Sequence, residues 1–415
     1  MDLVITLEHR FDRTPDGAIW TQTMFAQHFW QRYLAVFDRV RVVARVRDVA
    51  SVPLDWQPAD GANISFALVP YYLGPWQYLW RHRRVQRAVE QAFDPSHAII
   101  LRVGSQLAAC MQASLRRTGH PYAVEVVGDP YDVFAPGSIK HPLRPFFRWW
   151  FSRQLRQQCI GACAAAYVTE HALQRRYPAA ENTLMAGFSD VELPDAAFKV
   201  TTYYSSIDLP QSAIVAAPRY AQTKMPPYTL ITVATLAQLY KAPDVLIDAV
   251  AACVREGLDL RLVLIGDGKH RPELAARAAR LGLQERVTFL GQLPAGAAIR
   301  DQLDQADLFV LPSYQEGLPR AMIEAMARAL PCIGSNVGGI PELLSAENMV
   351  LPGDVTALAN KIREVVTDPQ RMEQMSIRNL EKAKEYREDI LHARRVAFYH
   401  QVREKTEAWL KTPTT

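Results

Sequence analysis

The sequence predicts an α/β protein of two domains in tandem, each built on a parallel sheet covered by helices. Its 415 residues are more than one ordinary core holds. Short apolar runs alternate with helical patterns along the chain, which is typical of parallel strands joined by helices. A proline-rich stretch, Lys199–Pro227, interrupts this alternation, which then starts again. We therefore expect one domain on each side of that stretch.

The N-terminal half begins with the apolar run Leu3–Leu7, which predicts the first strand. A loop over Asp12–Gly17 and an amphipathic helix from about Trp20 to Phe37 are expected next. Further strands are predicted at Val40–Val46, Ile64–Val69, Ala98–Val103, Tyr122–Val127, Ala165–Thr169 and Asn182–Met185. The later part of Lys199–Pro227 is interpreted as the interdomain linker.

The C-terminal half repeats the same architecture. Strands are predicted at Thr229–Ala234, Arg261–Ile265, Val287–Leu290, Leu308–Leu311 and Pro331–Ser335. Helices fall between them and end with Asp354–Val366, and a charged helical tail runs from Arg371 to about Leu410. In open α/β sheets ligands bind at the carboxyl ends of the strands, so the functional residues are expected in the loops that follow the strands.

Composition and charge exclude several classes of protein. Hydrophobic residues make up 49% of the chain, which favours a globular enzyme over disorder. No run reaches the ~18 apolar residues of a membrane helix, and the N-terminus does not resemble a signal peptide. Five scattered cysteines suit a reducing compartment, so a cytoplasmic location is expected. Cys159 and Cys163 have no third ligand nearby, which argues against zinc.

The small positive charge lies in the first half of the chain. Residues 1–200 carry 22 basic and 18 acidic side chains, and the formal net charge of the whole chain is +4. This excess is too small for a protein that binds nucleic acid. It is compatible with a surface that meets anionic lipid or a phosphorylated acceptor.

The strongest motif runs from Ser313 to Ala327, directly after the predicted strand Leu308–Leu311. It places Glu316 in the loop at the strand's end and Glu324 on the following helix, whose first turn suits a proline, here Pro319. The free N–H groups at Gly317 and Leu318 would form an anion-binding helix terminus. The loop carboxylate can accept hydrogen bonds from sugar hydroxyls, and the helix carboxylate can hold a ribose diol. The alternative is a helix cap and a solvated helix charge.

This segment resembles the Glu-x7-Glu motif of the retaining glycosyltransferases of family 4, whose fold is called GT-B and has two Rossmann-like domains facing a cleft. Three further segments match that family in the same order, and the resemblance covers Thr229 to about Leu344. They are Leu264–Gly268, Val287–Gly291 and Asn336–Glu342. Together they are a specific signal, whereas each alone would be weak. The pair Gly338-Gly339 also fits an ordinary tight turn before a helix that Pro341 begins.

The resemblance implies a role for each matching residue. Glu316 would bind the hydroxyls of the donor sugar and stabilise charge near the anomeric carbon, and Glu324 would hold the nucleotide's ribose. Backbone groups at Gly317 and Leu318 would contact the sugar or the phosphates. Phe289, Leu290 and Gly291 would line the base pocket. The resemblance also implies domains of about 1–223, which would bind the acceptor, and 224–385, which would bind the nucleotide sugar, with the terminal helix 386–411 packing back on the first domain.

The segment Val233–Asp244 looks like the family's phosphate-binding segment, where an Arg and a Lys usually clamp the diphosphate. Lys241 matches that Lys, but Thr235 stands where the Arg is common and Ala242 where Gly usually follows. A transferase must stabilise the charge that develops on the leaving diphosphate. That task would fall on Lys241, on helix N-termini and on the hydroxyl of Thr235. These differences from the family's pattern bear on the rate of transfer and on which donor is used.

The N-terminal half carries weaker candidates. Gly17 lies where the family has a glycine-rich loop between the first strand and the first helix, and it fits an ordinary turn equally well. Asp129 follows a predicted strand near the place where the family often has a His. It could bind a sugar hydroxyl or start a turn before Pro130.

Two basic and aromatic stretches, 71–84 and 142–153, suggest peripheral contact with a membrane. Trp and Tyr beside Arg are the residues found at lipid interfaces. The alternative is a helix with a buried aromatic face and a solvated basic face, which is the usual surface helix.

The resemblance thus implies a retaining transfer of a hexose from a UDP- or GDP-sugar to a hydroxyl of a glycan or lipid-linked glycan, and it also suggests bacterial polysaccharide synthesis. No cofactor is expected beyond the nucleotide-sugar substrate, and the absence of an Asp-x-Asp motif in a suitable loop predicts no requirement for metal. The alternatives are a non-catalytic subunit of a polysaccharide assembly complex and a nucleotide-sugar epimerase. A nicotinamide-dependent dehydrogenase is disfavoured because no Gly-x-Gly-x-x-Gly follows an early strand.

Overall fold

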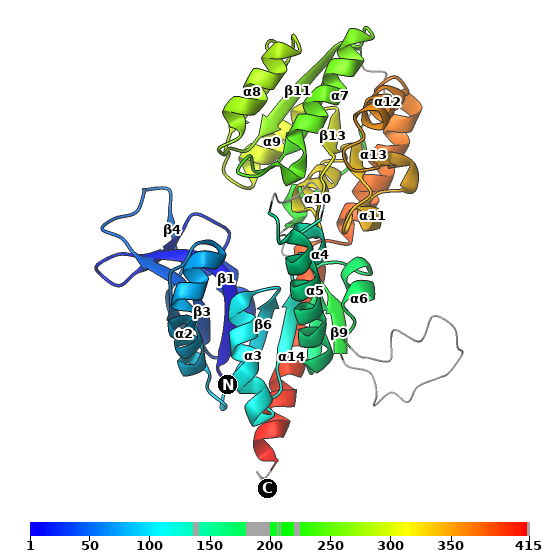
Figure 1. Cartoon of the computed structure of the whole chain (residues 1–415). Coiled ribbons are helices and arrows are strands. Elements are labelled where there is room, and N and C mark those ends of the chain that lie inside the picture. The colour runs from blue at the N-terminus through cyan, green and yellow to red at the C-terminus, as the bar shows by residue number, and fades with distance from the viewer. Residues whose placement is uncertain (136–140, 180–199, 206, 208, 220–224, 413–415) are drawn as a thin grey trace. The chain divides into compact units, whose positions relative to one another are not determined.

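The chain divides into two units, each with its own sheet (Figure 1). The computed structural model describes residues 1–135, 141–179, 200–205, 207, 209–219 and 225–412. The first unit comprises Met1–Pro130, Trp150–Tyr204 and His392–Thr415, and the second comprises Tyr131–Trp149 and Ser205–Leu391. Both are α/β units with parallel strands, so the predicted fold class is confirmed. The predicted domain bounds stay a prediction.

The sheet of the first unit is parallel through its centre. Its described strands are β1 (Leu3–Arg13), β2 (Ile19–Thr21), β3 (Val40–Asp48), β4 (Gln57–Pro58), β5 (Ile64–Pro70), β6 (Ala98–Val103), β7 (Ala123–Val126), β8 (Ala164–Tyr167) and β9 (Val200–Tyr203). The parallel strands follow the order β5-β3-β1-β6-β7-β8-β9, while β2 and β4 add a short antiparallel extension beside β1. The strands are apolar because helices cover both faces.

One face of this sheet is covered by α2 (Gly74–Ala92), α3 (Gln106–Thr118) and α5 (Arg144–Gly161), whose apolar residues share one core with the strands. On α2 these residues are Val85, Val89 and Ala92. The other face receives α1 (Gln27–Leu34) and the end of α14 (Glu388–Lys411). There the rings of Tyr33 and Tyr399 lie 4.8 Å apart. Two short helices, α4 (Pro130–Val133) and α6 (Ala172–Arg176), complete the N-terminal half.

The prediction of a helix from Trp20 to Phe37 is wrong for the first part of that range. Trp20 lies in β2 and pairs with Asp12 of β1, so the segment forms a β-hairpin, and the helix begins only at Gln27. The aromatic spacing resembled a helical period, but the hairpin buries Ile19 and Thr21 instead. The structure also has the strand β9 inside the stretch interpreted as irregular. The strand predicted at Asn182–Met185 lies outside the described residues.

The second unit has a fully parallel sheet among its described residues, in the order β12-β11-β10-β13-β14-β15. The strands are β10 (Tyr228–Val233), β11 (Leu260–Ile265), β12 (Val287–Gly291), β13 (Leu308–Leu311), β14 (Cys332–Ser335) and β15 (Met349–Val350). The first five match the predicted strands. The chain leaves β10 toward β12 and then returns to β13 on the other side of β10. The strand order therefore reverses between β10 and β13, which is where ligands bind in such sheets.

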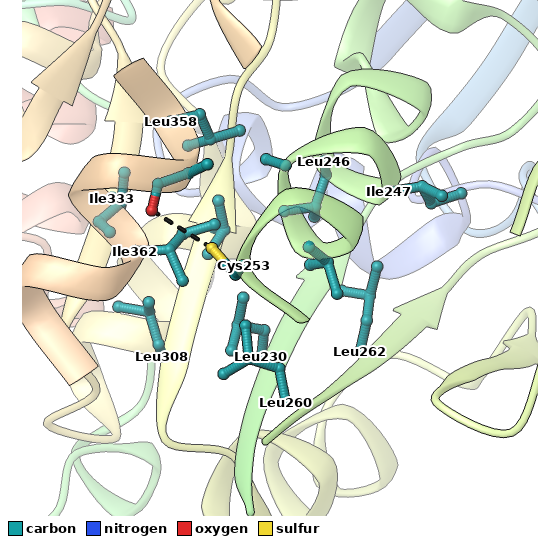
Figure 2. Packing of buried hydrophobic residues seen from close by; sticks show 14 of the residues in the cluster. Leu230, Leu246, Ile247, Cys253, Leu260, Leu262, Leu308, Ile333, Leu358 and Ile362 are labelled. Carbon is teal, nitrogen blue, oxygen red and sulfur yellow. Dashed lines mark hydrogen bonds between the residues drawn. The ribbon is translucent and has the colours of Figure 1, made fainter. Parts of the chain in front are cut away.

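The helices of the second unit are α7 (Pro243–Arg255), α8 (Arg271–Arg280), α9 (Ala297–Gln305), α10 (Arg320–Ala327), α11 (Ile340–Leu343), α12 (Val355–Val366) and α13 (Pro369–Lys384). Figure 2 shows how α7 and α12 close the core, with Leu246 and Ile362 packed over the strand residues Leu230 and Leu308. Cys253 Sγ donates a hydrogen bond to the carbonyl of Ala359 at 3.3 Å and joins the two helices.

The tail predicted as one helix from Arg371 is two helices. The side chain of Asp368 caps α13 by accepting from the N–H of Arg371, so the first helix starts earlier than predicted. It ends at Lys384, because the chain turns there and buries Tyr386. The helix α14 then begins at Glu388.

Candidate active site

The loops that follow β10 and β13 meet at the point where the strand order reverses. The N–H of Tyr314, in the loop after β13, donates to the carbonyl of Tyr240 in the loop after β10, at 2.8 Å. Because β10 and β13 are neighbouring parallel strands, their carboxyl ends lie at the same edge of the sheet. The side chains of these two loops therefore share one site.

At this edge Lys241 and Glu316 form a buried ion pair. Lys241 Nζ donates to Glu316 Oε1 at 2.6 Å and to Oε2 at 2.7 Å. The Glu316 side chain is 5% exposed and that of Lys241 is 17% exposed. Two residues chosen from sequence for the sugar and the diphosphate thus lie in direct contact, and the contact holds both charges in place.

A serine that sequence reasoning missed holds the carboxylate from the other side. Ser313 Oγ donates to Glu316 Oε1 at 2.6 Å, and the backbone carbonyl of Ser313 accepts from Ser335 Oγ. Both serines are fully buried. The signal available in the sequence was a hydroxyl three residues before Glu316, directly after an apolar strand. The link to Ser335 joins residues 22 positions apart and depends on the pairing of β13 with β14.

The loop at Gly338 is fixed by close contact with the backbone of Glu316. A Cβ on Gly338 would lie 1.9 Å from the carbonyl oxygen of Glu316, and the residue has φ +52°. The N–H of Gly339 donates to the carbonyl of Gly317 at 2.7 Å. A turn before α11 does exist, as the simpler interpretation held. In addition, the glycine lets this loop hold the Glu316 segment.

Two more glycines pack the β11 loop against the β10 loop. A Cβ on Gly266 would lie 1.9 Å from the carbonyl oxygen of Ala234, and one on Gly268 would lie 2.1 Å from the nitrogen of Ala237. The two glycines of the segment Leu264–Gly268 therefore have a steric cause, since any side chain would push the two loops apart.

The backbone conformation of the residue after Lys241 explains why the family usually has glycine at this position. Ala242 has φ +51°, a left-handed conformation, and it is fully buried at the start of α7. An alanine in this conformation costs about 1 kcal/mol relative to glycine. Thr235, where the family usually has an Arg, is exposed, and its hydroxyl accepts from the N–H of Ala237 at 3.3 Å.

Glu324 lies on α10, two turns after the Glu316 loop. Burial raises the pKa of Glu324 above its usual value, and the positive charges of Arg320 and Arg300 only partly oppose this. Its carboxylate has no hydrogen-bond partner among the described residues. The N–H groups of Gly317 and Leu318 likewise have no acceptor in the described part of the chain. These groups could serve a polar ligand.

The proposed base pocket lies on the edge strand β12. The carbonyl of Phe289 accepts from Arg271 Nη2 at 3.1 Å, and that of Gly291 accepts from the N–H of Gly266 at 2.8 Å. Leu290 is 37% exposed. Two of the three carbonyls are therefore engaged within the unit, and the role of this segment in base binding stays a prediction.

The two candidates in the first unit have structural partners of their own. Asp129 is 7% exposed, receives a 2.5 Å hydrogen bond from Tyr177 OH and pairs with Arg176. Gly17, at φ +91°, closes a turn by donating to the carbonyl of Thr14, but this turn joins β1 to β2 and not a strand to a helix. Their functional roles stay predictions.

Comparison with known proteins agrees with this arrangement. Residues 227–368 match the family model described as glycosyl transferases group 1, and the match covers every element of the site in the second unit. Over these residues the chain is similar to the group 1 glycosyltransferases. Its solved structural neighbours are GT-B glycosyltransferases, which confirms the expected fold.

Individual relatives differ in how much of the chain they match. Protein CapJ of Staphylococcus aureus is 23% identical over 356 residues, which are 86% of this chain and 84% of CapJ. The Vi polysaccharide biosynthesis protein VipC/TviE of Salmonella typhi is 37% identical over 100 residues, or 24% of this chain and 17% of that protein. The structure of sucrose-phosphate synthase from Thermosynechococcus elongatus superposes with a TM-score of 0.65 at 16% identity, over 97% of this chain and 99% of the synthase. That last likeness concerns the fold alone.

Proposed function

We propose that this chain is a glycosyltransferase, which moves a hexose, with retention of anomeric configuration, from a UDP- or GDP-sugar to a hydroxyl of a glycan or lipid-linked oligosaccharide. The observation that carries the proposal is the Lys241–Glu316 pair at the junction of β10 and β13. A cation and a carboxylate side by side at a strand-order reversal suit a ligand that carries phosphates at one end and hydroxyls at the other.

Donor binding would exchange the partners of these two charges. The diphosphate replaces the carboxylate on Lys241 Nζ, and Glu316 then accepts hydrogen bonds from the donor's sugar hydroxyls. Ser313 keeps the carboxylate oriented during the exchange, because its hydroxyl bonds only one of the two oxygens. The unengaged N–H groups at Gly317 and Leu318 add donors for the phosphates or the sugar.

The transfer itself would take place on one face of the sugar. The bond between the anomeric carbon and the phosphate oxygen breaks, and the acceptor oxygen bonds to that carbon from the same side. The acceptor's proton passes to the departing phosphate oxygen, and the nucleoside diphosphate leaves. Lys241 stabilises the charge on the leaving group, and the proposal uses no metal ion.

Glu324 would hold the ribose. Its half-buried carboxylate has no hydrogen-bond partner among the described residues, and a ribose diol would supply two donors. A ribose bound here would complete the hydrogen bonds of this carboxylate.

The proposed setting is polysaccharide synthesis in the bacterial cytoplasm. One relative is named as a Vi polysaccharide biosynthesis protein and is 37% identical over 100 residues. The five cysteines all lie in the described part of the chain and form no disulfide there, which is compatible with a reducing compartment.

The test is calorimetric binding of UDP and GDP to the wild-type chain and to Glu324→Gln. One nucleotide should bind, and the variant should bind it about tenfold more weakly, because a hydrogen bond to a charged group is lost. Glu381→Gln, an exposed acid on α13, is the matched control and should bind as the wild type does. Failure of UDP, GDP, ADP and TDP alike to bind would overturn the proposal.

One observation favours the non-catalytic alternative, namely that an exposed Thr235 stands where the family usually has an Arg. A nucleotide-sugar donor incubated with the protein and an acceptor mixture distinguishes the candidates. Release of nucleoside diphosphate with a new glycosidic bond supports the transferase, and NMR of that bond reports retention. Conversion of the donor sugar without an acceptor would indicate an epimerase.

A further inference from the structure

The helix layer α2, α3 and α5 of the first unit is basic to a degree that the rest of the chain does not share. Within the first unit, α2, α3 and the part of α5 from Trp150 on carry eight arginines and one acidic residue, Glu90, whereas the chain as a whole has 47 basic and 43 acidic residues. No helix in the described ranges is long and apolar enough to cross a membrane.

The outer face of α2 exposes large apolar side chains. Trp76 is 74% exposed, Leu79 61% and Trp80 90%. Their spacing of three and four residues places them together on one side of the first two turns. Val85 and Val89, which pack into the core, lie on the opposite side. Both tryptophans of this helix therefore face solvent, whereas Tyr78 packs against the core. The interpretation of 71–84 as a helix with a buried aromatic face is wrong for the tryptophans.

Arginines continue the same face toward the C-terminal end of α2. Arg83, Arg84 and Arg87 follow Leu79 and Trp80 at helical spacing and are exposed. None of the three has an ion-pair partner among the described residues. In the second unit, by contrast, arginines such as Arg277 and Arg328 pair with aspartates. The face thus consists of an apolar end followed by uncompensated positive charge.

The neighbouring helices extend this basic face. A groove of about 390 Å³ lies between α3 and α5, and its lining includes Gln112, Arg116, Trp150 and Gln157. Both helices pack on the same side of the sheet as α2. Arg116 and the half-exposed Trp150 repeat the combination of cation and aromatic ring found on α2.

We propose that this face docks on the surface of an anionic phospholipid bilayer. Trp76, Leu79 and Trp80 enter the boundary between headgroups and acyl chains, and Arg83 and Arg87 contact the lipid phosphates. Tryptophan is favoured at that boundary, and arginine near an anionic surface is attracted by it. Charge complementarity selects anionic lipid over a neutral bilayer. The inference does not rest on the proposed transferase reaction, because vesicle binding needs neither donor nor acceptor.

The test is co-sedimentation of the full chain with vesicles of phosphatidylcholine, with and without phosphatidylglycerol. The wild type should bind the vesicles that contain phosphatidylglycerol and lose binding as salt rises. The triple variant Trp76→Ser/Leu79→Ser/Trp80→Ser should lower the partition coefficient about tenfold or more, because its apolar anchor is gone. The matched control Leu54→Ser/Leu351→Ser removes exposed leucines elsewhere and should bind as the wild type does.

A second pair of variants tests the charge. Arg83→Glu/Arg87→Glu should weaken binding about tenfold or more, whereas Arg261→Glu/Arg280→Glu, with the same change in net charge on the second unit, should have little effect. Circular dichroism confirms that each variant folds. Absence of wild-type binding to anionic vesicles, or equal loss with both charge variants, would overturn the proposal. So would binding to a soluble anionic glycan but not to vesicles, or a dimer that the tryptophan variant dissociates.

Discussion

Lys241 donates hydrogen bonds to both carboxylate oxygens of Glu316, across the junction of β10 and β13. The two residues are 75 positions apart in the chain, so the contact exists only because their strands are neighbours. It keeps each charge compensated while the site holds no ligand.

Removal of both partners of this pair should cost less stability than the two single removals added together. Lys241→Met leaves a buried carboxylate that still accepts from Ser313 but has lost its counter-charge, so we expect the free energy of unfolding to fall by about 3 kcal/mol. The double variant Lys241→Met/Glu316→Gln should lose less than the sum of the single variants. Urea denaturation measures all three. Additive losses would show that the pair contributes no coupling.

Glu324→Gln should stabilise the protein at neutral pH. Burial raises the pKa of Glu324, so the folded chain binds its proton more tightly than the unfolded chain does. The ionised carboxylate therefore costs stability above that pKa, and the cost disappears as the pH falls through it. The gain in melting temperature of the glutamine variant should be largest at pH 7 and should shrink in acid. A variant that is less stable than the wild type at pH 7 would contradict this account of the site.

The parallel strands and the donor-site motif were predictable because both are local patterns. Apolar runs such as Leu308–Leu311 identify buried strands, and the spacing of Glu316 and Glu324 identifies the loop and helix that follow. The role of Ser313 was not predictable, because a serine after a strand is common and its function depends on where Glu316 points. The β1–β2 hairpin was missed because its aromatic residues imitate a helical period.

Gly338→Ala should disturb the Glu316 loop beyond the cost of its backbone conformation. The new Cβ would lie 1.9 Å from the carbonyl oxygen of Glu316, so the backbone of one loop has to move. Gly282→Ala is a matched control in the same unit, since Gly282 has φ +73° and a Cβ added there would meet no atom within 4 Å. The control should cost about 1 kcal/mol of stability, and Gly338→Ala clearly more. Nucleotide binding should weaken only in the Gly338 variant, and equal effects in both assays would refute the steric argument.

His9 should make the first unit less stable in mild acid. Burial, with smaller contributions from Arg10 and Arg45, lowers the pKa of His9 to about 4. Between that value and about 6.5, the unfolded chain binds the proton and the folded chain does not, so stability falls as the pH drops through this window. The loss amounts to at most about 3 kcal/mol.

Comparison of the wild type with His9→Gln isolates the contribution of His9 to this acid sensitivity. The glutamine amide can still reach the hydroxyls of Thr21 and Thr23. The variant's melting temperature should depend less on pH between about 6.5 and 4.5 than that of the wild type. His400→Gln, which replaces an exposed histidine on α14, should follow the wild type. Parallel curves for wild type and His9→Gln would assign the acid sensitivity to other groups.

A buried carboxylate, Glu125 on β7, connects the helices α1 and α14 to the sheet of the first unit. Arg102 pairs with it at 2.6 Å, and the hydroxyls of Tyr33, Tyr204 and Tyr399 donate to it at 2.9–3.2 Å. The strands that carry Arg102 and Glu125 were predicted as apolar runs. The charges are tolerated there because they lie side by side on β6 and β7 and because Glu125 accepts hydrogen bonds from Arg102 and from three tyrosines.

Glu125→Gln should therefore destabilise the first unit by about 3 kcal/mol, since it leaves the guanidinium of Arg102 buried without its counter-charge.

Tyr399→Phe removes a single 3.2 Å hydrogen bond and should cost about 1 kcal/mol. Hydrogen exchange should then show faster opening of α14 residues near Tyr399, because this hydroxyl is one of the bonds that join the helix to the sheet. Glu404→Gln, an exposed change on the same helix, controls for charge and should leave both readouts unchanged. A wild-type exchange pattern in Tyr399→Phe would show that ring packing against Tyr33 and Phe37 holds α14 without help from the carboxylate.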